Sequence, residues 1–207
     1  MTIHEPATLL TDLLLAVLAT GLGGHLWRST GSAAARWCAL ALAGTAVSAL
    51  VGGLYHGFAP NFAPEIARAW WTFTLLGICL TALAMDLALL HETVARGRRR
   101  PGLVAIALKA AIFSGGAIVQ PAFVVVIVNY GLTLVAWTIA AVRGRQPWRG
   151  AMLLGIGLSL GAAAVQQLRI GLSPRFNHND LYHVIQAVAL VAFALAGRRF
   201  ADHAPAA

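Results

Sequence analysis

Residues 177–197 read NHNDLYHVIQAVALVAFALAG, a polar opening followed by an apolar run. No side chain in residues 187–197 is polar or charged, and with the residues before it this stretch approaches the ~20 residues with which a helix spans hydrocarbon. His183 lies about one turn into the segment. Polar groups at a membrane boundary are costly and usually functional, so His183 is the first candidate functional residue.

The whole composition agrees with that stretch. The 207 residues are 59% hydrophobic and 11% charged, with a mean hydropathy of +0.75, which excludes an ordinary soluble domain. Seven apolar segments are found, at residues 7–27, 33–58, 67–90, 102–119, 122–142, 151–167 and 181–197. They lack the alternation of barrel strands, and lipid offers no partner to free backbone groups. We therefore predict an all-α polytopic membrane protein whose residues 1–207 form one seven-helix transmembrane domain.

The arginines predict the orientation. Eleven fall in loops on one side: Arg28, Arg36, Arg96, Arg98, Arg99, Arg100, Arg143, Arg145, Arg149, Arg198 and Arg199. The other side has Arg68, Arg169 and Arg175. The positive-inside rule puts the N-terminus outside and the C-terminus in the cytoplasm. The net charge of +8 is thus mostly a topology signal, and we expect no nucleic-acid partner.

Two further expectations concern processing and location. Residues 1–6 lack the positive region of a secretory signal, so we expect the first segment to be retained as a span. The chain is rich in Ala and Arg and poor in Lys, as in proteins from GC-rich bacterial genomes. We therefore expect an integral protein of the bacterial inner membrane.

Polar residues from six segments should gather in the outer half of the bundle. They are Asp12, His56, Arg68, Trp70, Trp71, Asn129, Gln166, Gln167, Arg169, His178, Asp180, His183 and Gln186. His56, His183 and Asp12 lie at similar depth on three helix ends, and this recurrence favours a site. With Asp180 as helix cap and His178 in the preceding loop, His178 could supply a third nitrogen. Three histidines with one open position are a common catalytic zinc arrangement.

Other polar groups have structural interpretations. We expect Asp86 and Lys109 to pair within the inner half. Trp27, Trp37, Trp70, Trp71 and Trp148 lie near segment ends, as in an interfacial aromatic belt. Cys38 and Cys79 fall within apolar segments and are interpreted as packing residues.

This arrangement resembles the CREST superfamily of seven-helix membrane hydrolases, which includes alkaline ceramidases, progestin and adipoQ receptors and Per1-like proteins. In that superfamily the second helix carries Ser-x-x-x-His and the seventh His-x-x-x-His. Here His56 matches the second-helix histidine, with Gly52 in the serine position and Ser48 a turn deeper. His183 matches the last histidine, and Asn179 occupies the place of the first.

The remaining superfamily positions are filled only by substitutes. His178 could serve with a shift of one residue. The third-helix region holds Glu65 and Arg68 but no aspartate, so Asp12 or Asp180 would have to take the place of the superfamily's aspartate. The stretches EPAT at residues 5–8, TD at 11–12 and NHNDLYH at 177–183 also resemble a bacterial family that we place beside this superfamily.

The resemblance implies a zinc-dependent hydrolase of a lipid amide or ester bond, acting near the outer leaflet on a membrane lipid. His56, His178 and His183 would bind the metal, and Asp12 or Asp180 would handle the proton. The alternative is a non-catalytic protein that binds or transports a small solute or a proton in the same polar pocket. The missing serine and the irregular histidine spacing favour this alternative.

A third hypothesis is haem ligation by two histidine pairs, His56 with His183 outside and His25 with His91 inside. Retinal is disfavoured because the last segment lacks a lysine for a Schiff base.

Overall fold

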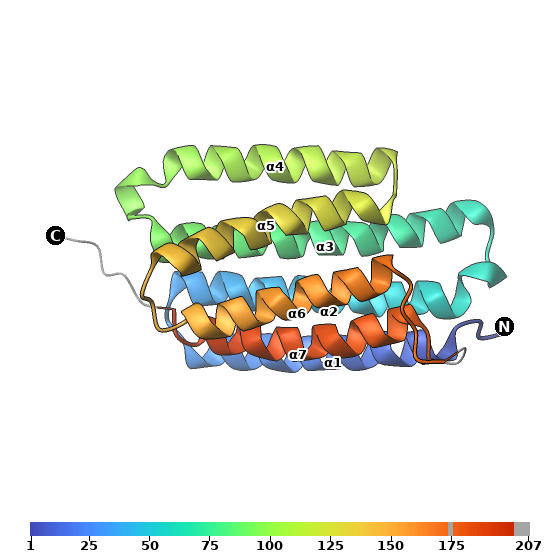
Figure 1. Ribbon diagram of the computed structural model, residues 1–207. Coiled ribbons are helices and arrows are strands. Elements are labelled where there is room, and N and C mark those ends of the chain that lie inside the picture. The colour runs from blue at the N-terminus through green and yellow to red at the C-terminus, as the bar shows by residue number, and fades with distance from the viewer. Residues whose placement is uncertain (174–175, 201–207) are drawn as a thin grey trace.

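The computed structural model describes residues 1–173 and 176–200, so Arg175 lies outside the described residues. Within them the chain forms seven α-helices and two short 3₁₀ turns, and no strand (Figure 1). The elements are α1 Pro6–Ser29, α2 Ala33–Phe58, η1 Ala59–Asn61, α3 Pro64–Thr93, η2 Arg96–Arg98, α4 Arg100–Val119, α5 Phe123–Arg143, α6 Arg149–Gln167 and α7 His178–Gly197. All seven α-helices are long and apolar enough to cross a membrane. The predicted all-α class is confirmed, and the seven helices suggest an integral membrane protein.

Several helices begin before the apolar segments that predict them. α1, α3 and α4 start with proline in the first or second position, where its missing N–H has no intrahelical partner to lose. Ser32 caps α2 by accepting a hydrogen bond from the N–H of Ala35. α7 begins at His178 rather than at residue 181. Hydropathy detects where a span enters lipid, whereas helices start at their caps.

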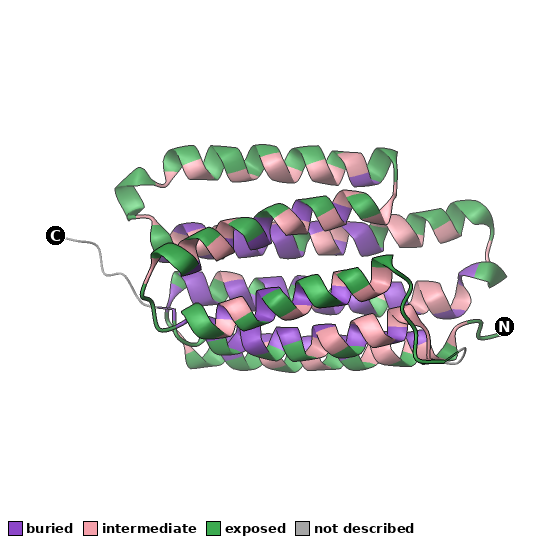
Figure 2. Cartoon of the chain, viewed as in Figure 1, coloured by how far each residue is buried: buried purple, intermediate pink, exposed green. Residues whose placement is uncertain are grey.

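Six helices form a ring, and the remaining helix, α4, lies outside it. Neighbours pack in the order α1, α2, α3, α5, α6 and α7, and α7 returns to α1. α4 packs only along α3 and α5, at the edge of the bundle (Figure 1), and Ala117 is its one buried residue. Figure 2 shows how much of α4 is exposed compared with α2, α3 and α7. Whatever the ring encloses is therefore independent of α4.

The ring is closed tightly where α2 meets α3 and α1. A Cβ added to Gly77 would lie 2.8 Å from Ser48 Cβ, and one on Gly53 would lie 2.7 Å from Asp12 Cβ. Glycine at these positions lets the helix backbones approach closely. Gly53 thereby brings Asp12 of α1 against the α2 backbone.

The end of the ring that carries the C-terminus is filled by aromatic side chains. Trp137 stacks on Phe200, and Trp148 meets both edge-on. The indole N–H of Trp148 donates to Glu92 Oε1 at 2.7 Å. Trp148 is buried, so its assignment to an interfacial belt is wrong. These packed aromatic side chains occupy this end of the ring.

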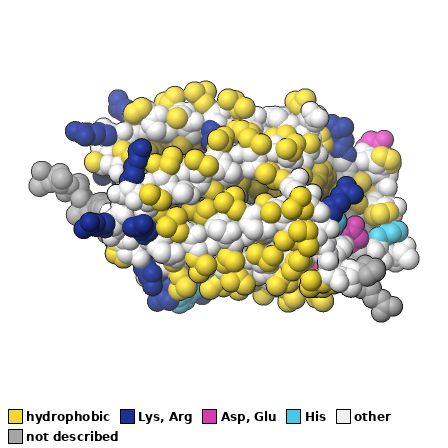
Figure 3. Space-filling view, viewed as in Figure 1, with side chains coloured by type: hydrophobic (Ala, Val, Ile, Leu, Met, Phe, Trp, Pro, Cys, Tyr) yellow, Lys and Arg dark blue, Asp and Glu magenta, His cyan; other side chains and the backbone are white. Residues whose placement is uncertain are grey.

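Two other sequence predictions concern buried side chains. Lys109 Nζ lies 2.7 Å from Asp86 Oδ2 and 2.6 Å from Thr133 Oγ1, which confirms the predicted pair and ties α4 to α3 and α5. Cys38 and Cys79 are free and buried. Basic side chains gather at the end of the bundle that carries the C-terminus (Figure 3), where the loops with most of the arginines lie.

Candidate functional site

A cavity of about 270 Å³ lies inside the ring, on the side of the α1 N-terminus. Its lining comes from all six ring helices and includes no residue of α4. It reaches from His56, near the end of α2, down to Thr45, about 16 Å deeper along the helix. The lining residues are Asp12, Leu15, Thr45, Ser48, Ala49, Gly52, His56, Trp71, Thr74, Ile78, Thr81, Phe123, Tyr130, Gln166, His178, Asn179, Tyr182, His183 and Gln186.

Four of the five proposed site residues line this one cavity: Asp12, His56, His178 and His183. From the larger set expected in the outer half, Trp71, Gln166 and Gln186 line it as well. The others of that set do not: Arg68, Trp70, Asn129, Gln167, Arg169 and Asp180. Arg68, for example, is exposed and donates to the carbonyl of Val119.

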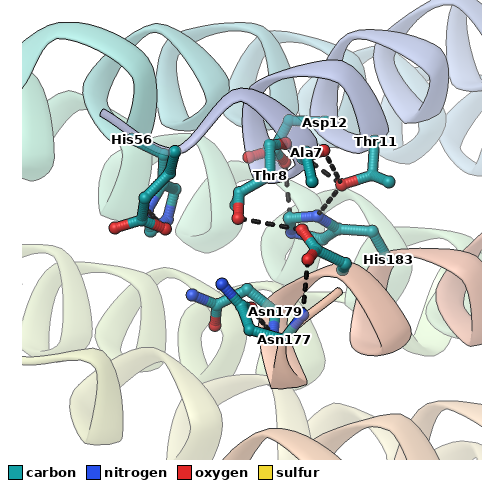
Figure 4. Close-up of polar contacts among 10 residues, drawn as sticks. Ala7, Thr8, Thr11, Asp12, His56, Asn177, Asn179 and His183 are labelled. Carbon is teal, nitrogen blue, oxygen red and sulfur yellow. Dashed lines mark hydrogen bonds and ion pairs between the residues drawn. The ribbon is translucent and has the colours of Figure 1, made fainter. Parts of the chain in front are cut away.

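His183 lies between two side chains of α1 (Figure 4). Its Nδ1 is 3.0 Å from Thr11 Oγ1, and its Nε2 is 3.2 Å from Asp12 Oδ1. The exposed fractions of His183 and Asp12 are 8% and 4%. Both ring nitrogens are therefore occupied by α1, and the array of Thr11, His183 and Asp12 joins the first span to the last.

The hydrogen bonds of this array are compatible with two numbers of protons. Thr11 has one hydroxyl hydrogen and three acceptors in range: Ala7 O at 3.0 Å, Thr8 O at 3.1 Å and His183 Nδ1. If Thr11 donates to a backbone carbonyl, Nδ1 must carry a hydrogen, and a second proton is shared between Nε2 and Asp12. If Thr11 donates to Nδ1, only the Nε2 hydrogen remains and Asp12 is a carboxylate. Rotation of one hydroxyl thus accompanies uptake of one proton.

The other carboxylate oxygen of Asp12 is also distinctive. Asp12 Oδ2 is buried and has no hydrogen-bond partner among the described residues. A buried charged or polar atom normally has one. Asp12 thus has an unpartnered oxygen in a residue that lines the cavity.

Asp180 stabilises the start of α7 and does not line the cavity. Its Oδ2 accepts the N–H of Asn177 at 2.6 Å, closing a capping box at the start of α7, and its Oδ1 accepts the hydroxyl of Thr8 at 2.9 Å. Asp180 is fully buried. Both oxygens are used to fix α7 and to attach it to α1, and the capping residue is Asn177 rather than Asp180 as we expected.

His178 is helical, which corrects its predicted place in a loop. It is the first residue of α7, directly after the Asn177 cap. It still lines the cavity together with His183, although five residues along a helix are turned about 140° apart.

His56 borders the cavity and pairs with a residue that the sequence did not single out. Its Nδ1 is 3.3 Å from Glu5 Oε2, and its ring lies edge-on to Trp71. Glu5 directly precedes α1. Near it, the N–H of His4 donates to the carbonyl of Gly57, so the residues before α1 are fixed to the end of α2.

The three histidines do not fit a zinc site as they are arranged. Both nitrogens of His183 are engaged by Thr11 and Asp12, and Nδ1 of His56 is engaged by Glu5. In the part of the chain that the structure describes, no three His, Cys, Asp or Glu side chains are grouped to hold a metal ion. A haem bound through His183 would need the same nitrogens.

Sequence reasoning gave the threonines no place in the site. Thr8 and Thr11 of α1 contact Asp180 and His183, and Thr45, Thr74 and Thr81 line the cavity beside Ser48. One signal was available, since Thr8, Thr11 and Asp12 are spaced i, i+3, i+4 and so share a helix face.

No curated protein and no solved structure matches this chain. One family model does match, over residues 7–202, and it covers all seven helices from the first turn of α1. The chain therefore belongs to the family of unknown function DUF6962.

Proposed function

We propose that this protein is a non-catalytic membrane protein that binds, or carries across the membrane, a small polar solute together with a proton, using the cavity within the ring. The observation that carries the proposal is the pair of Asp12 and His183. It borders the cavity, its two partners are joined at 3.2 Å, and its proton content can change by one.

The cavity supports a small ligand rather than a large one. Its volume of about 270 Å³ is near the lower end of typical ligand pockets. The walls combine apolar side chains such as Leu15 and Ile78 with the amides of Gln166 and Gln186. Polar groups placed among apolar side chains are typical of a site that orients one small molecule.

The orientation and location belong to the same proposal. We place the N-terminus and the cavity mouth outside and the arginine-rich end in the cytoplasm, because of the arginine asymmetry between the loops. The cavity then takes its ligand from the outer side. We place the protein in the bacterial inner membrane on the basis of its composition.

The experiment is a ligand screen on purified protein in lipid nanodiscs. Thermal unfolding is followed with small cationic, neutral, zwitterionic and anionic solutes, for the wild type and for Asp12→Asn. A ligand at about 100 times its Kd stabilises the folded protein by about 2.7 kcal/mol. We expect at least one solute class to stabilise the wild type and not the variant. If the solutes change the thermal stability of the wild type and of Asp12→Asn equally, the proposal is contradicted.

A zinc-dependent lipid amide or ester hydrolase, as the CREST resemblance implies, is the second candidate. It is favoured by one observation, that His56, His178 and His183 border a single cavity. Element analysis separates the two candidates. The binding protein should contain less than about one tenth of an equivalent of zinc, whereas a full equivalent that is lost in His183→Ala would establish the metal site.

A further inference from the structure

The hydroxyl groups of the cavity present oxygen lone pairs. Each hydroxyl has one hydrogen and two lone pairs, and here backbone carbonyls accept the hydrogens. The bonds run from Thr45 to Ala41 at 3.1 Å, from Ser48 to Thr74 at 2.9 Å, from Thr74 to Trp70 at 3.2 Å, and from Thr81 to Gly77 at 3.1 Å. The α2 and α3 wall of the cavity is therefore rich in acceptors and poor in donors.

The charges of the lining residues also favour a cation over an anion. Asp12 is the one carboxylate among the lining residues of the described chain, and these residues include no lysine or arginine. An anion in this cavity would find no fixed cation, whereas a cation would find Asp12. Buried charges are stable only when they are paired.

Gly52 lies beside two oxygen atoms of this wall, one on Asp12 and one on Thr74. A Cβ added at Gly52 would lie 3.9 Å from Asp12 Oδ2 and 3.9 Å from Thr74 Oγ1. Its contact with Thr74 Cγ2, at 3.2 Å, is tight but not prohibitive. The neighbouring Gly53 is different, since its Cβ would meet Asp12 at 2.7 Å. A side chain at Gly53 would collide with Asp12, whereas a methyl group at Gly52 would crowd Thr74 and take up the space near the carboxylate oxygen of Asp12 and the hydroxyl oxygen of Thr74.

We propose that the ligand of this cavity carries a primary ammonium group, which binds in the space at Gly52 against Asp12 Oδ2 and the hydroxyl oxygen of Thr74. The inference rests on the proposed function and names its ligand class. An ammonium group has three donors and no acceptor, which complements a wall of acceptors. Its bond to the carboxylate is charge-assisted, and it gives the buried Oδ2 of Asp12 a partner.

The size of the cavity separates this ligand from an inorganic ion. A volume of about 270 Å³ greatly exceeds one bare monovalent cation and suits a small organic molecule. The opposite wall, with Tyr130, Tyr182 and Gln186, has both donors and acceptors for the rest of that molecule.

The test is equilibrium binding of radiolabelled methylammonium to the full chain in nanodiscs at constant ionic strength, with tetramethylammonium, sodium, glycerol and acetate as competitors. We expect methylammonium to bind and the four competitors to displace it poorly. Gly52→Ala should weaken binding by about tenfold or more. The matched control is Gly24→Ala, because a Cβ there meets no atom within 4 Å, and it should stay within about twofold.

A second variant protects the test against misfolding. Thr74→Val removes the hydroxyl and keeps the shape of the side chain, and it should also weaken methylammonium binding by about tenfold. Equal binding of methylammonium to wild type, Gly52→Ala and Thr74→Val overturns the inference.

The competitors separate this inference from the proposed function. If methylammonium does not bind, but the thermal-unfolding screen finds another solute that stabilises the wild type and not Asp12→Asn, the ammonium inference fails and the binding function stands. If tetramethylammonium or sodium displaces labelled methylammonium as well as unlabelled methylammonium does, the hydrogen-bonding site at Gly52 is refuted. If methylammonium does not bind and no solute of that screen stabilises the wild type, both proposals fail.

Discussion

At the scale of single residues, the histidine of the last span is held by hydrogen bonds on both sides of its ring. A buried imidazole is stable in the membrane because Thr11 and Asp12 satisfy its two nitrogens. Asp12 and His183 could be predicted, because charged and imidazole groups are conspicuous among apolar residues. The spacing of Thr11 predicts that it shares a helix face with Thr8, but not that it bonds His183, since threonine in a helix usually bonds only its own backbone.

Thr11→Val tests this array. The change leaves His183 Nδ1 without its partner, so we expect a loss of about 1 to 3 kcal/mol of stability and an unfolding midpoint that falls by several degrees. The control is Thr20→Val. Thr20 is on the same helix and bonds the Ala16 carbonyl in the same way, but it is exposed. Similar midpoints for the two variants would contradict the role of Thr11.

At the scale of helices, the start of α7 depends on α1. Asp180 completes the capping box of Asn177 and also accepts the hydroxyl of Thr8. A cap can be recognised in a sequence from the spacing of Asn177 and Asp180. The partner on α1, 172 residues away, cannot be recognised, because it depends on how two distant helices meet.

A double-mutant cycle measures that link. Thr8→Val and Asp180→Ala should each destabilise the protein, and the double variant should be less destabilised than the sum, with a coupling of about 0.5 to 3 kcal/mol. Thermal unfolding of the four proteins gives the value. Strict additivity would show that the Thr8 hydroxyl and Asp180 do not interact.

The outer helix α4 depends on a buried ion pair. Lys109 connects it to Asp86 and Thr133, and α4 has little other buried surface. Lys109→Met leaves Asp86 unpaired and should cost about 3 kcal/mol or more. Adding Asp86→Leu should recover much of that loss, because the unpaired charge is removed. Leu108→Met, at an exposed neighbouring position, is the control. A double variant less stable than Lys109→Met would refute this account.

At the scale of the whole molecule, the two ends of the ring differ. One end is a plug of Trp137, Trp148 and Phe200, and the other holds the cavity. In the proposed function the cavity takes its ligand from one side of the membrane, as in one state of a transport cycle. The orientation of the chain is therefore part of that proposal.

Cysteine labelling in intact cells tests that direction. The native Cys38 and Cys79 are buried, so the wild type should react little with a membrane-impermeant maleimide. Leu172→Cys introduces a thiol at an exposed site on the cavity side and should be labelled from outside. Gly97→Cys, in the loop that contains η2, should react only after lysis. The reverse pattern would place the cavity mouth in the cytoplasm.

The sequence by itself determined the all-α class, the seven spans and the polar residues worth following, because hydrophobicity and helix length are local properties of the chain. It also predicted that Asp86 and Lys109 pair, since isolated charges in lipid are too costly. Only the tertiary structure decided which polar residues meet. It placed Asp12 against His183, bound Asp180 to Thr8 within the capping box of α7, and brought Gly52 close to Asp12 and Thr74. These outcomes depend on the rotation and spacing of neighbouring helices, which hydropathy does not encode.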